Sequence, residues 1–191
     1  MNFSPFFTRP LQTGQQAMIE AVLSRFPEHI LSLMLEHGIK IVPLLEAEQY
    51  LHASAALQKR NVNVDAWPIA PAGLFVCEER TLYLRSMDEI TIGHEIGHAV
   101  DLCLGNGVYR SSYDVRIRRA FADTREFVNP YSATGLDEFM AEGIRHYYEF
   151  NSSTSPWPKA TRQRLQERTP ELFTIIEEFF TPPAVPAAIA C

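Results

Sequence analysis

Two histidines and a glutamate at positions 94 to 98 have the types and spacing of a metal-dependent hydrolytic site. The segment reads His-Glu-Ile-Gly-His. On a helix, His94 and His98 would lie one turn apart on the same face, where both imidazoles can reach one zinc ion. Glu95 would then point beside the metal, where a general base for a zinc-bound water belongs. The pattern also arises by chance at an appreciable rate, so the surrounding sequence has to support it.

The sequence around this segment predicts a long helix with one buried stripe. Ser86 and Glu89 have the spacing of a capping box at its start, and Gly105 suits the position just past its end. About 18 residues lie between these signals. Apolar residues recur there at helical spacing, at Ile92, Ile96, Ala99 and Cys103. Both histidines lie near this stripe, which favours an interior metal site over two ordinary, partly buried histidines.

A catalytic zinc site needs a third protein ligand and an open position for water. The candidates are the other histidines, His29, His37, His52 and His146, and the carboxylates of a helix that packs on the first one. Glu138, Glu142 and His146 are spaced at i, i+4 and i+8 and therefore share a helix face. We expect Glu138 to point inward among apolar neighbours and Glu142 to hydrogen-bond the free N–H of a ligand histidine. We expect His146 to be structural. A solvated helix face is the alternative for both glutamates.

Together these segments resemble the zinc-peptidase family that contains the anthrax lethal factor catalytic domain and the secreted Pro-Pro endopeptidases. Residues 94–101 look like that family's zinc helix. Residues 131–142 look like its second signature, which is a tyrosine, a glutamate seven residues later, and then Phe-x-Ala-Glu. The resemblance implies that Tyr131 acts in catalysis, that Glu138 is the third ligand and that Glu142 supports the site. We expect the chain to depart from the family by lacking a secretion signal and large targeting domains.

Together with this resemblance, the remaining patterns predict an α+β fold, a mainly helical zincin-like domain with a small mixed sheet and hairpin before the zinc helix. We expect a single zinc-peptidase domain over 1–180, in which 14–105 hold the small sheet and the zinc helix and 106–180 hold the third ligand. Residues 181–191 read as an extended, Pro/Ala-rich tail. A second capping box is predicted at Thr134 to Asp137. Besides the zinc helix, helical patterns cover 14–26, 27–38, 47–60, 114–127, 134–150 and 169–180, and β-rich runs cover 39–42, 73–77 and 81–85.

The composition limits the classes of partner. With 191 residues and a net charge of −6, the chain is expected to bind neither nucleic acid nor an anionic membrane surface. Cys77, Cys103 and Cys191 are odd in number and widely spaced, so we expect reduced thiols. No signal-peptide pattern is present at the N-terminus, so we expect a cytoplasmic protein, with non-classical secretion or delivery as the alternative.

The sequence therefore predicts a zinc metalloendopeptidase with one catalytic Zn²⁺ ion. Its metal ligands would be His94, His98 and Glu138, and its catalytic residues Glu95 and Tyr131. The substrate would be an extended peptide or protein that pairs with an edge of the hairpin over 73–85. The alternatives are a zinc-stabilised module that binds a peptide without cutting it, and a delivered effector or toxin peptidase.

Overall fold

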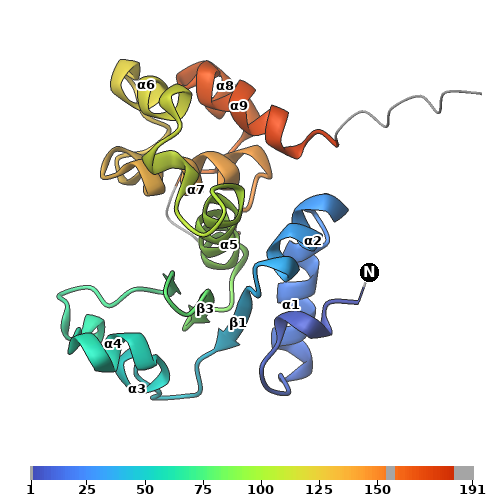
Figure 1. Ribbon diagram of the computed structural model, residues 1–191, viewed down its shortest axis with the longest axis vertical. Helices are drawn as coiled ribbons and strands as arrows, with labels where there is room; N and C mark the ends of the chain where they lie inside the picture. The colour runs from blue at the N-terminus through green and yellow to red at the C-terminus, as the bar shows by residue number, and fades with distance from the viewer. Residues whose placement is uncertain (1, 154–157, 183–191) are drawn as a thin grey trace, which may run out of the picture.

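A computed structural model describes residues 2–153 and 158–182. Helix α5 lies at the centre of the molecule, between the sheet with its flanking helices α1–α4 and the C-terminal helices α6, α8 and α9 (Figure 1). The helices are α1 Thr13–Leu23, α2 Glu28–Glu36, α3 Tyr50–Ala53, α4 Ala55–Arg60, α5 Glu89–Leu104, α6 Val115–Asp123, α7 Leu136–Tyr147, α8 Arg162–Arg168 and α9 Pro170–Phe180. Short 3₁₀ turns are η1 Ser4–Phe6, η2 Val64–Ala66, η3 Arg110–Ser112 and η4 Tyr131–Ala133.

The described strands form one small mixed sheet, as the sequence predicted. They are β1 Lys40–Pro43, β2 Gly73–Val76 and β3 Thr81–Leu84, in the order β1-β3-β2. The predicted hairpin is confirmed, because β2 and β3 pair antiparallel, while β1 joins β3 in parallel. Since β3 is central, β2 is an edge strand. It pairs with β3 alone in the part of the chain that the structure describes.

The zinc helix of the prediction is α5, but it is capped differently from the expected Ser86–Glu89 box. The N-cap is Asp88, whose carboxylate accepts from the backbone N–H of Thr91 at 3.0 Å. Ser86 instead donates its hydroxyl to Asp88 at 2.5 Å. A carboxylate is a stronger acceptor than a hydroxyl and also complements the positive end of the helix dipole. The helix closes at Gly105, as expected.

The predicted capping box at Thr134 is also wrong. Gly135 is the N-cap of α7 and offers no side chain, while the Thr134 hydroxyl donates to the backbone oxygen of Tyr131 at 2.8 Å. Thr134 therefore closes the 3₁₀ turn η4 rather than opening the helix. The helix itself ends at Tyr147, three residues before the predicted end.

The expected helix over 47–60 is broken into α3 and α4. Ser54 is extended between them, and its hydroxyl accepts from the backbone N–H of Leu57, so it caps α4. Ala47 has a left-handed backbone and cannot belong to a helix. Helix α6 is shorter than the predicted 114–127, and α8 was not predicted.

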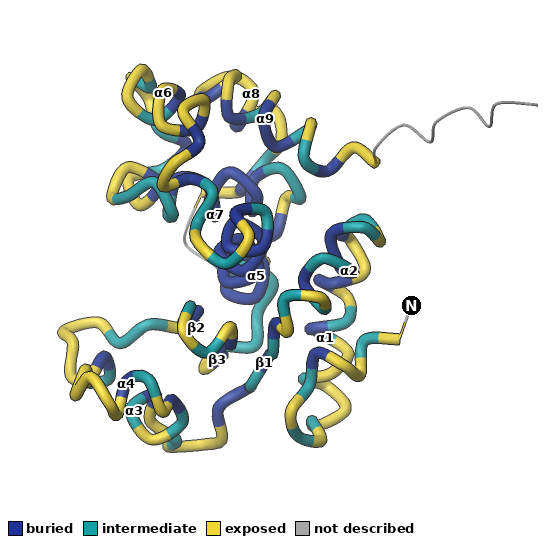
Figure 2. Tube along the Cα trace, viewed as in Figure 1, coloured by how far each residue is buried: buried dark blue, intermediate teal, exposed yellow. Residues whose placement is uncertain are grey.

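Helices α5 and α7 pack closely enough to bring their polar faces together. A Cβ atom on Gly97 would lie 2.9 Å from Cα of Ala141, so a glycine is required where the two helices approach. Residues 91–103 of α5 are all buried, and this helix is the most continuously buried segment in Figure 2. The two faces of the hairpin pack against two separate hydrophobic cores. Phe75 packs toward α5, and Tyr83 packs toward Tyr50.

None of the described helices is both long and apolar enough to cross a membrane. Cys77 and Cys103 are free thiols, as expected. Cys191 and all of the predicted tail beyond residue 182 lie outside the described residues.

Candidate metal centre

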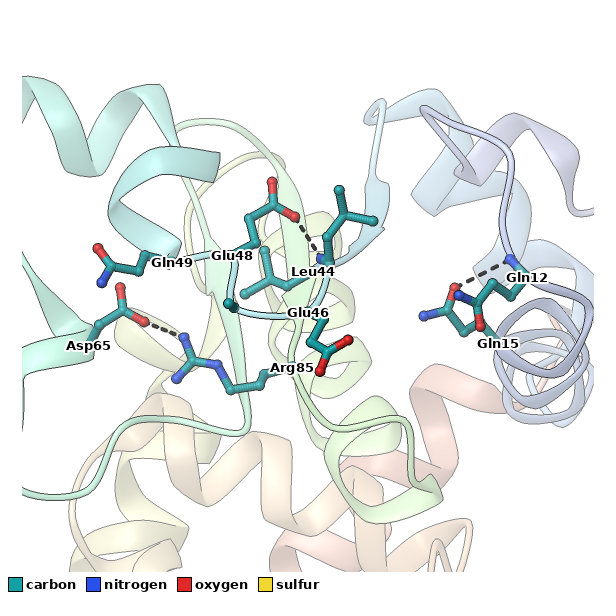
Figure 3. A pocket seen from close by; sticks show the side chains of 10 residues that line it. Gln12, Gln15, Leu44, Glu46, Glu48, Gln49, Asp65 and Arg85 are labelled. Atoms are coloured by element: carbon teal, nitrogen blue, oxygen red, sulfur yellow. Dashed lines mark hydrogen bonds and ion pairs between the residues drawn. The ribbon is translucent and has the colours of Figure 1, made fainter.

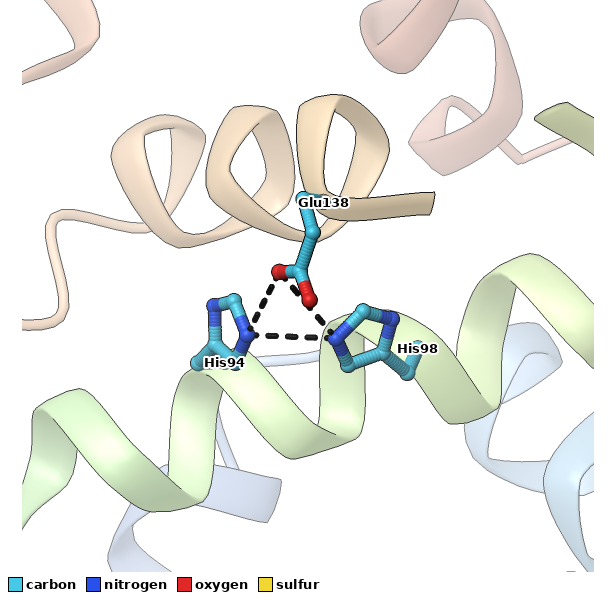
Figure 4. Close-up of side chains that lie close together, drawn as sticks. All are labelled: His94, His98 and Glu138. Carbon is cyan, nitrogen blue, oxygen red and sulfur yellow. Dashed lines mark hydrogen bonds and ion pairs between the residues drawn. The ribbon is translucent and has the colours of Figure 1, made fainter. Parts of the chain in front are cut away.

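Three side chains from two helices converge on one point (Figure 4). His94 and His98 come from α5, and Glu138 comes from the first turn of α7. The Nε2 atoms of the two histidines are 3.1 Å apart, and Oε2 of Glu138 lies 3.1 Å from the first and 3.5 Å from the second. Both histidines are buried, and the Glu138 side chain is 19% exposed.

The donor atoms fit a zinc ion in identity and in spacing. Three ligands about 2.0–2.1 Å from a tetrahedral zinc lie about 3.3–3.4 Å from one another, close to the three separations found here. Two imidazole nitrogens that face each other and a carboxylate oxygen also have more lone pairs than protons to share. Glu138 Oε2 is a buried atom that has no hydrogen-bond partner within the described residues. His94, His98 and Glu138 could therefore hold one metal ion.

Glu142 fixes the orientation of the first histidine. Its Oε1 lies 2.9 Å from Nδ1 of His94, so this nitrogen carries the proton and Nε2 keeps a lone pair for a metal ion. Its Oε2 accepts from Nδ2 of Asn129 at 2.5 Å and from Nε and Nη2 of Arg145 at 3.0 Å each. The carboxylate is thus held from both sides and has little freedom to turn.

The opposite charges of His94 and of the two glutamates, Glu138 and Glu142, stabilise one another. Burial lowers the pKa of His94, but the neighbouring carboxylates of Glu138 and Glu142 outweigh it and raise that pKa to about 10. Burial opposes ionisation of both glutamates, yet the histidines hold the pKa of Glu138 well below its usual range and lower that of Glu142 to about 2. The cluster could therefore hold a cation in place of the His94 proton.

Glu95 and Tyr131, the predicted catalytic residues, line one cavity beside the cluster. This cavity measures about 380 Å³, and His94 and Glu142 form part of its wall. Burial raises the pKa of Glu95. The Tyr131 hydroxyl donates to Oε1 of Glu138 at 3.0 Å. Burial and the neighbouring Glu138 raise the pKa of this phenol above its usual range, so the phenol keeps its proton. The other lining residues are Ile69, Ala70, Pro71, Ala72, Gly73, Ile90, Thr91, Asn129 and Arg145.

The other histidines that the sequence offered as metal ligands do not contribute a ligand atom to the cluster. His146 is buried one turn beyond Glu142 and donates from Nδ1 to the backbone oxygen of Glu142 at 2.8 Å, so it is structural as expected. Nε2 of His29 contacts the backbone oxygen of Phe179. None of His29, His37 and His52 belongs to the metal cluster found among the described residues.

Sequence reasoning missed three residues at or beside the site. Arg145 follows Glu142 by three positions on α7, and this spacing was a signal that could have revealed the pair. Asn129 lies 13 residues before Glu142, outside the helix, and only the fold shows that the two meet. Tyr109 was also missed. Its ring packs on that of His98 with centroids 5.9 Å apart.

A second and larger cavity, of about 500 Å³, lies away from the cluster near the start of α1 and the segment 44–49 (Figure 3). Its carboxylates include Asp65, which pairs with Arg85, and Glu48, which pairs with Arg9. These charges are already balanced within the protein. The smaller cavity is the better candidate for chemistry, because His94 of the cluster and Glu95 both line it.

Comparison with solved structures shows the same fold in a known enzyme. The structure of the Pro-Pro endopeptidase PPEP-2 from Paenibacillus alvei matches with a TM-score of 0.66 over 93% of this chain and 98% of that chain. The two sequences are 18% identical in this alignment. No family model matches the chain, and no curated protein matches it by sequence. The α+β fold expected from the resemblance is therefore confirmed.

Proposed function

We propose that the chain is a zinc-dependent endopeptidase that hydrolyses peptide bonds in a peptide or protein substrate. The observation that carries this proposal is the position of Glu95, which follows a ligand histidine in sequence and lines the cavity beside the cluster of His94, His98 and Glu138. The fold shared with a Pro-Pro endopeptidase supports the same reading.

His94, His98 and Glu138 would hold the zinc ion, and Glu142 would keep His94 oriented toward it. Zinc in such a site acts as a Lewis acid and lowers the pKa of water from near 16 toward about 7. A site with three protein ligands leaves one position open, which distinguishes a catalytic from a purely structural zinc site.

Glu95 would act as the general base. Its carboxylate would take a proton from the attacking water and deliver it to the nitrogen of the leaving amine. Burial raises the pKa of this carboxyl group, which makes it a better proton acceptor than an exposed glutamate. The cavity on this side of the cluster has room for the substrate atoms that the proton must reach.

Tyr131 would stabilise the oxyanion that forms on the attacked carbonyl. Its phenol keeps its proton and is therefore a hydrogen-bond donor. Its hydroxyl is directed at Oε1 of Glu138, and the residue is 49% exposed, so the ring can turn toward a substrate oxygen. Donors of this kind contribute about 2.7–4 kcal/mol to catalysis.

The substrate would bind as an extended strand along β2. This strand is the edge of the sheet, and its first residue, Gly73, lines the cavity that holds Glu95. An edge strand provides backbone donors and acceptors for an added strand. Antiparallel addition is the more stable arrangement per residue, and it would place the C-terminal part of the substrate beside Gly73.

The test is to incubate the zinc-loaded protein with a proteome-derived peptide library and to measure both binding and cleavage. The proposal expects internal cleavage that stops when a chelator removes the metal. Binding without any cleavage would contradict it and would favour a zinc-stabilised peptide-binding module. Detection of the active protein outside the cells that produce it would identify a delivered effector peptidase.

A further inference from the structure

The general base proposed above lies against the edge strand as well as beside the metal cluster. Glu95 is 7% exposed and projects from α5 toward β2. The backbone of Phe75 in β2 lies near enough to hydrogen-bond its carboxylate. The position of this carboxylate therefore depends on how closely β2 approaches α5.

Gly73 is the point of closest approach. A Cβ atom on this residue would lie 2.6 Å from Cγ and 2.9 Å from Oε1 of Glu95, and 2.8 Å from Cγ2 of Thr91. The backbone of Gly73 is in an ordinary strand conformation, so the glycine is not required for a left-handed φ. What position 73 requires is the absence of a side chain, because Glu95 and Thr91 occupy that space.

An added methyl group would lie too close to both neighbours, and Glu95 is the one that can move farther. Thr91 is β-branched, and its hydroxyl donates to the N-cap Asp88 at 3.0 Å, so its rotamer is fixed by the start of the helix. The Glu95 side chain has more freedom. Carbon atoms in contact lie about 3.5 Å or more apart, so a methyl group at position 73 would displace Cγ of Glu95 by about 1 Å.

We propose that Gly73 is a positioning residue for Glu95, because its missing side chain leaves the space in which β2 holds this carboxylate beside the metal cluster. The catalytic role of Gly73 rests on the proposed function, but the contact between position 73 and Glu95 can be tested without measuring activity. A misplacement of about 1 Å in a catalytic group can reduce turnover by about 100-fold.

The experiment compares Gly73→Ala with the matched control Gly14→Ala. Nothing in the described structure lies within 4 Å of a Cβ atom added at position 14. Zinc content, melting temperature, kcat and KM are measured for each variant on a peptide that the wild type cleaves. We expect Gly73→Ala to keep its zinc and its KM and to lose about 10- to 100-fold in kcat, whereas Gly14→Ala matches the wild type. A wild-type kcat for Gly73→Ala would overturn the inference.

A double-mutant cycle shows whether the effect passes through Glu95. In a Glu95→Gln background, Gly73→Ala should lower the residual rate no further. An equal loss in both backgrounds would mean a merely structural role. The companion variant Gly73→Ala/Thr91→Ser removes Cγ2 of Thr91. If this variant regains the wild-type kcat, Thr91 rather than Glu95 is the residue that position 73 serves.

Crystal structures of the wild type and of Gly73→Ala at the same metal content give a readout that does not depend on activity. The inference expects Cγ of Glu95 to shift by about 1 Å and Cγ2 of Thr91 to shift by less. An unmoved Glu95 would overturn it. If Glu95 shifts but the wild type cleaves no peptide, the positioning relationship holds and the proposed peptidase function fails.

Discussion

Oε1 of Glu142 lies 2.9 Å from Nδ1 of His94, on the side of the imidazole ring that faces away from the metal cluster. This contact decides which ring nitrogen carries the proton. Asn129 and Arg145 also hold Glu142 in place. Glu142 therefore couples the orientation of His94 on α5 to α7 and to the turn before α7. The metal cluster is therefore fixed by the contact between two helices and not by α5 alone.

Replacing Glu142 with glutamine should weaken zinc binding. The amide can still accept the Nδ1 proton of His94, but it no longer carries the charge that makes Nε2 more basic, and it leaves Arg145 without its ion pair. We expect an affinity that is lower by about 10- to 100-fold, measured by competition with a chromophoric chelator. Glu36→Gln, an exposed substitution of the same type, is the control and should bind zinc as the wild type does. Equal affinities for all three proteins would contradict the assigned role.

The Tyr131→Phe variant should lose turnover without losing metal. The phenol hydroxyl is the donor proposed for the oxyanion, so its removal should lower kcat by about 10²- to 10³-fold and change KM little. Tyr113→Phe removes a hydroxyl from a tyrosine that is 50% exposed, and it should leave kcat unchanged. Steady-state kinetics on one peptide provide both values. A Tyr131→Phe enzyme with wild-type kcat would exclude the phenol from catalysis.

Gly97→Ala should destabilise the protein by disturbing the contact between α5 and α7. The added Cβ would lie 2.9 Å from Cα and 3.0 Å from the backbone oxygen of Ala141, and backbone atoms cannot give way as a side chain can. We expect a loss of about 1–3 kcal/mol in the free energy of unfolding, seen as a melting temperature several degrees lower. Gly14→Ala, which meets no neighbour, should show no loss. Equal melting temperatures for the two variants would show that α5 and α7 are not tightly packed.

His146 should contribute to unfolding at acid pH. Burial and the neighbouring Arg145 lower its pKa to about 4, whereas an unfolded chain has a histidine pKa of about 6.5. The folded state therefore binds fewer protons between these values. The stabilising contribution is fully present above pH 6.5 and is lost as pH falls to about 4, by up to about 3 kcal/mol.

The His146→Gln variant tests this dependence. Glutamine keeps an N–H donor for the backbone oxygen of Glu142 but cannot be charged. The difference in the free energy of unfolding between wild type and variant should therefore shift in favour of the variant as pH falls from 7 to 4. Denaturant titrations at several pH values measure it, and contributions from the metal cancel in the difference. A difference that is independent of pH would contradict the buried, neutral state of His146.

The parts of the site that share a helix could be predicted from sequence. His94 and His98 are four residues apart, as are Glu138 and Glu142, and such spacing places side chains on one face whatever the rest of the fold does. The contact between the two pairs was predicted on two grounds. A helix face that could supply a carboxylate ligand was needed, and the sequence resembles a known family. The structure brings these residues together in the expected arrangement.

The residues that sequence reasoning missed depend on contacts between separate elements. Gly73 and Glu95 are 22 positions apart, and nothing in a strand pattern reveals which helical side chain lies under a particular glycine. Both predicted capping boxes failed because Ser86 and Thr134 have alternative partners close in sequence. Their hydroxyls donate to a nearby carboxylate or carbonyl oxygen. A local sequence pattern does not reveal whether such a bond or the helix cap will form.

The most direct test of the account is the activity and zinc content of Glu95→Gln. Glutamine has the same shape as glutamate but cannot take a proton from water, and Glu95 is not among the expected metal ligands. We predict that the variant binds one zinc ion with wild-type affinity and that its rate of peptide cleavage falls by at least about 100-fold. A variant that keeps its zinc and cleaves as fast as the wild type would contradict the proposed mechanism.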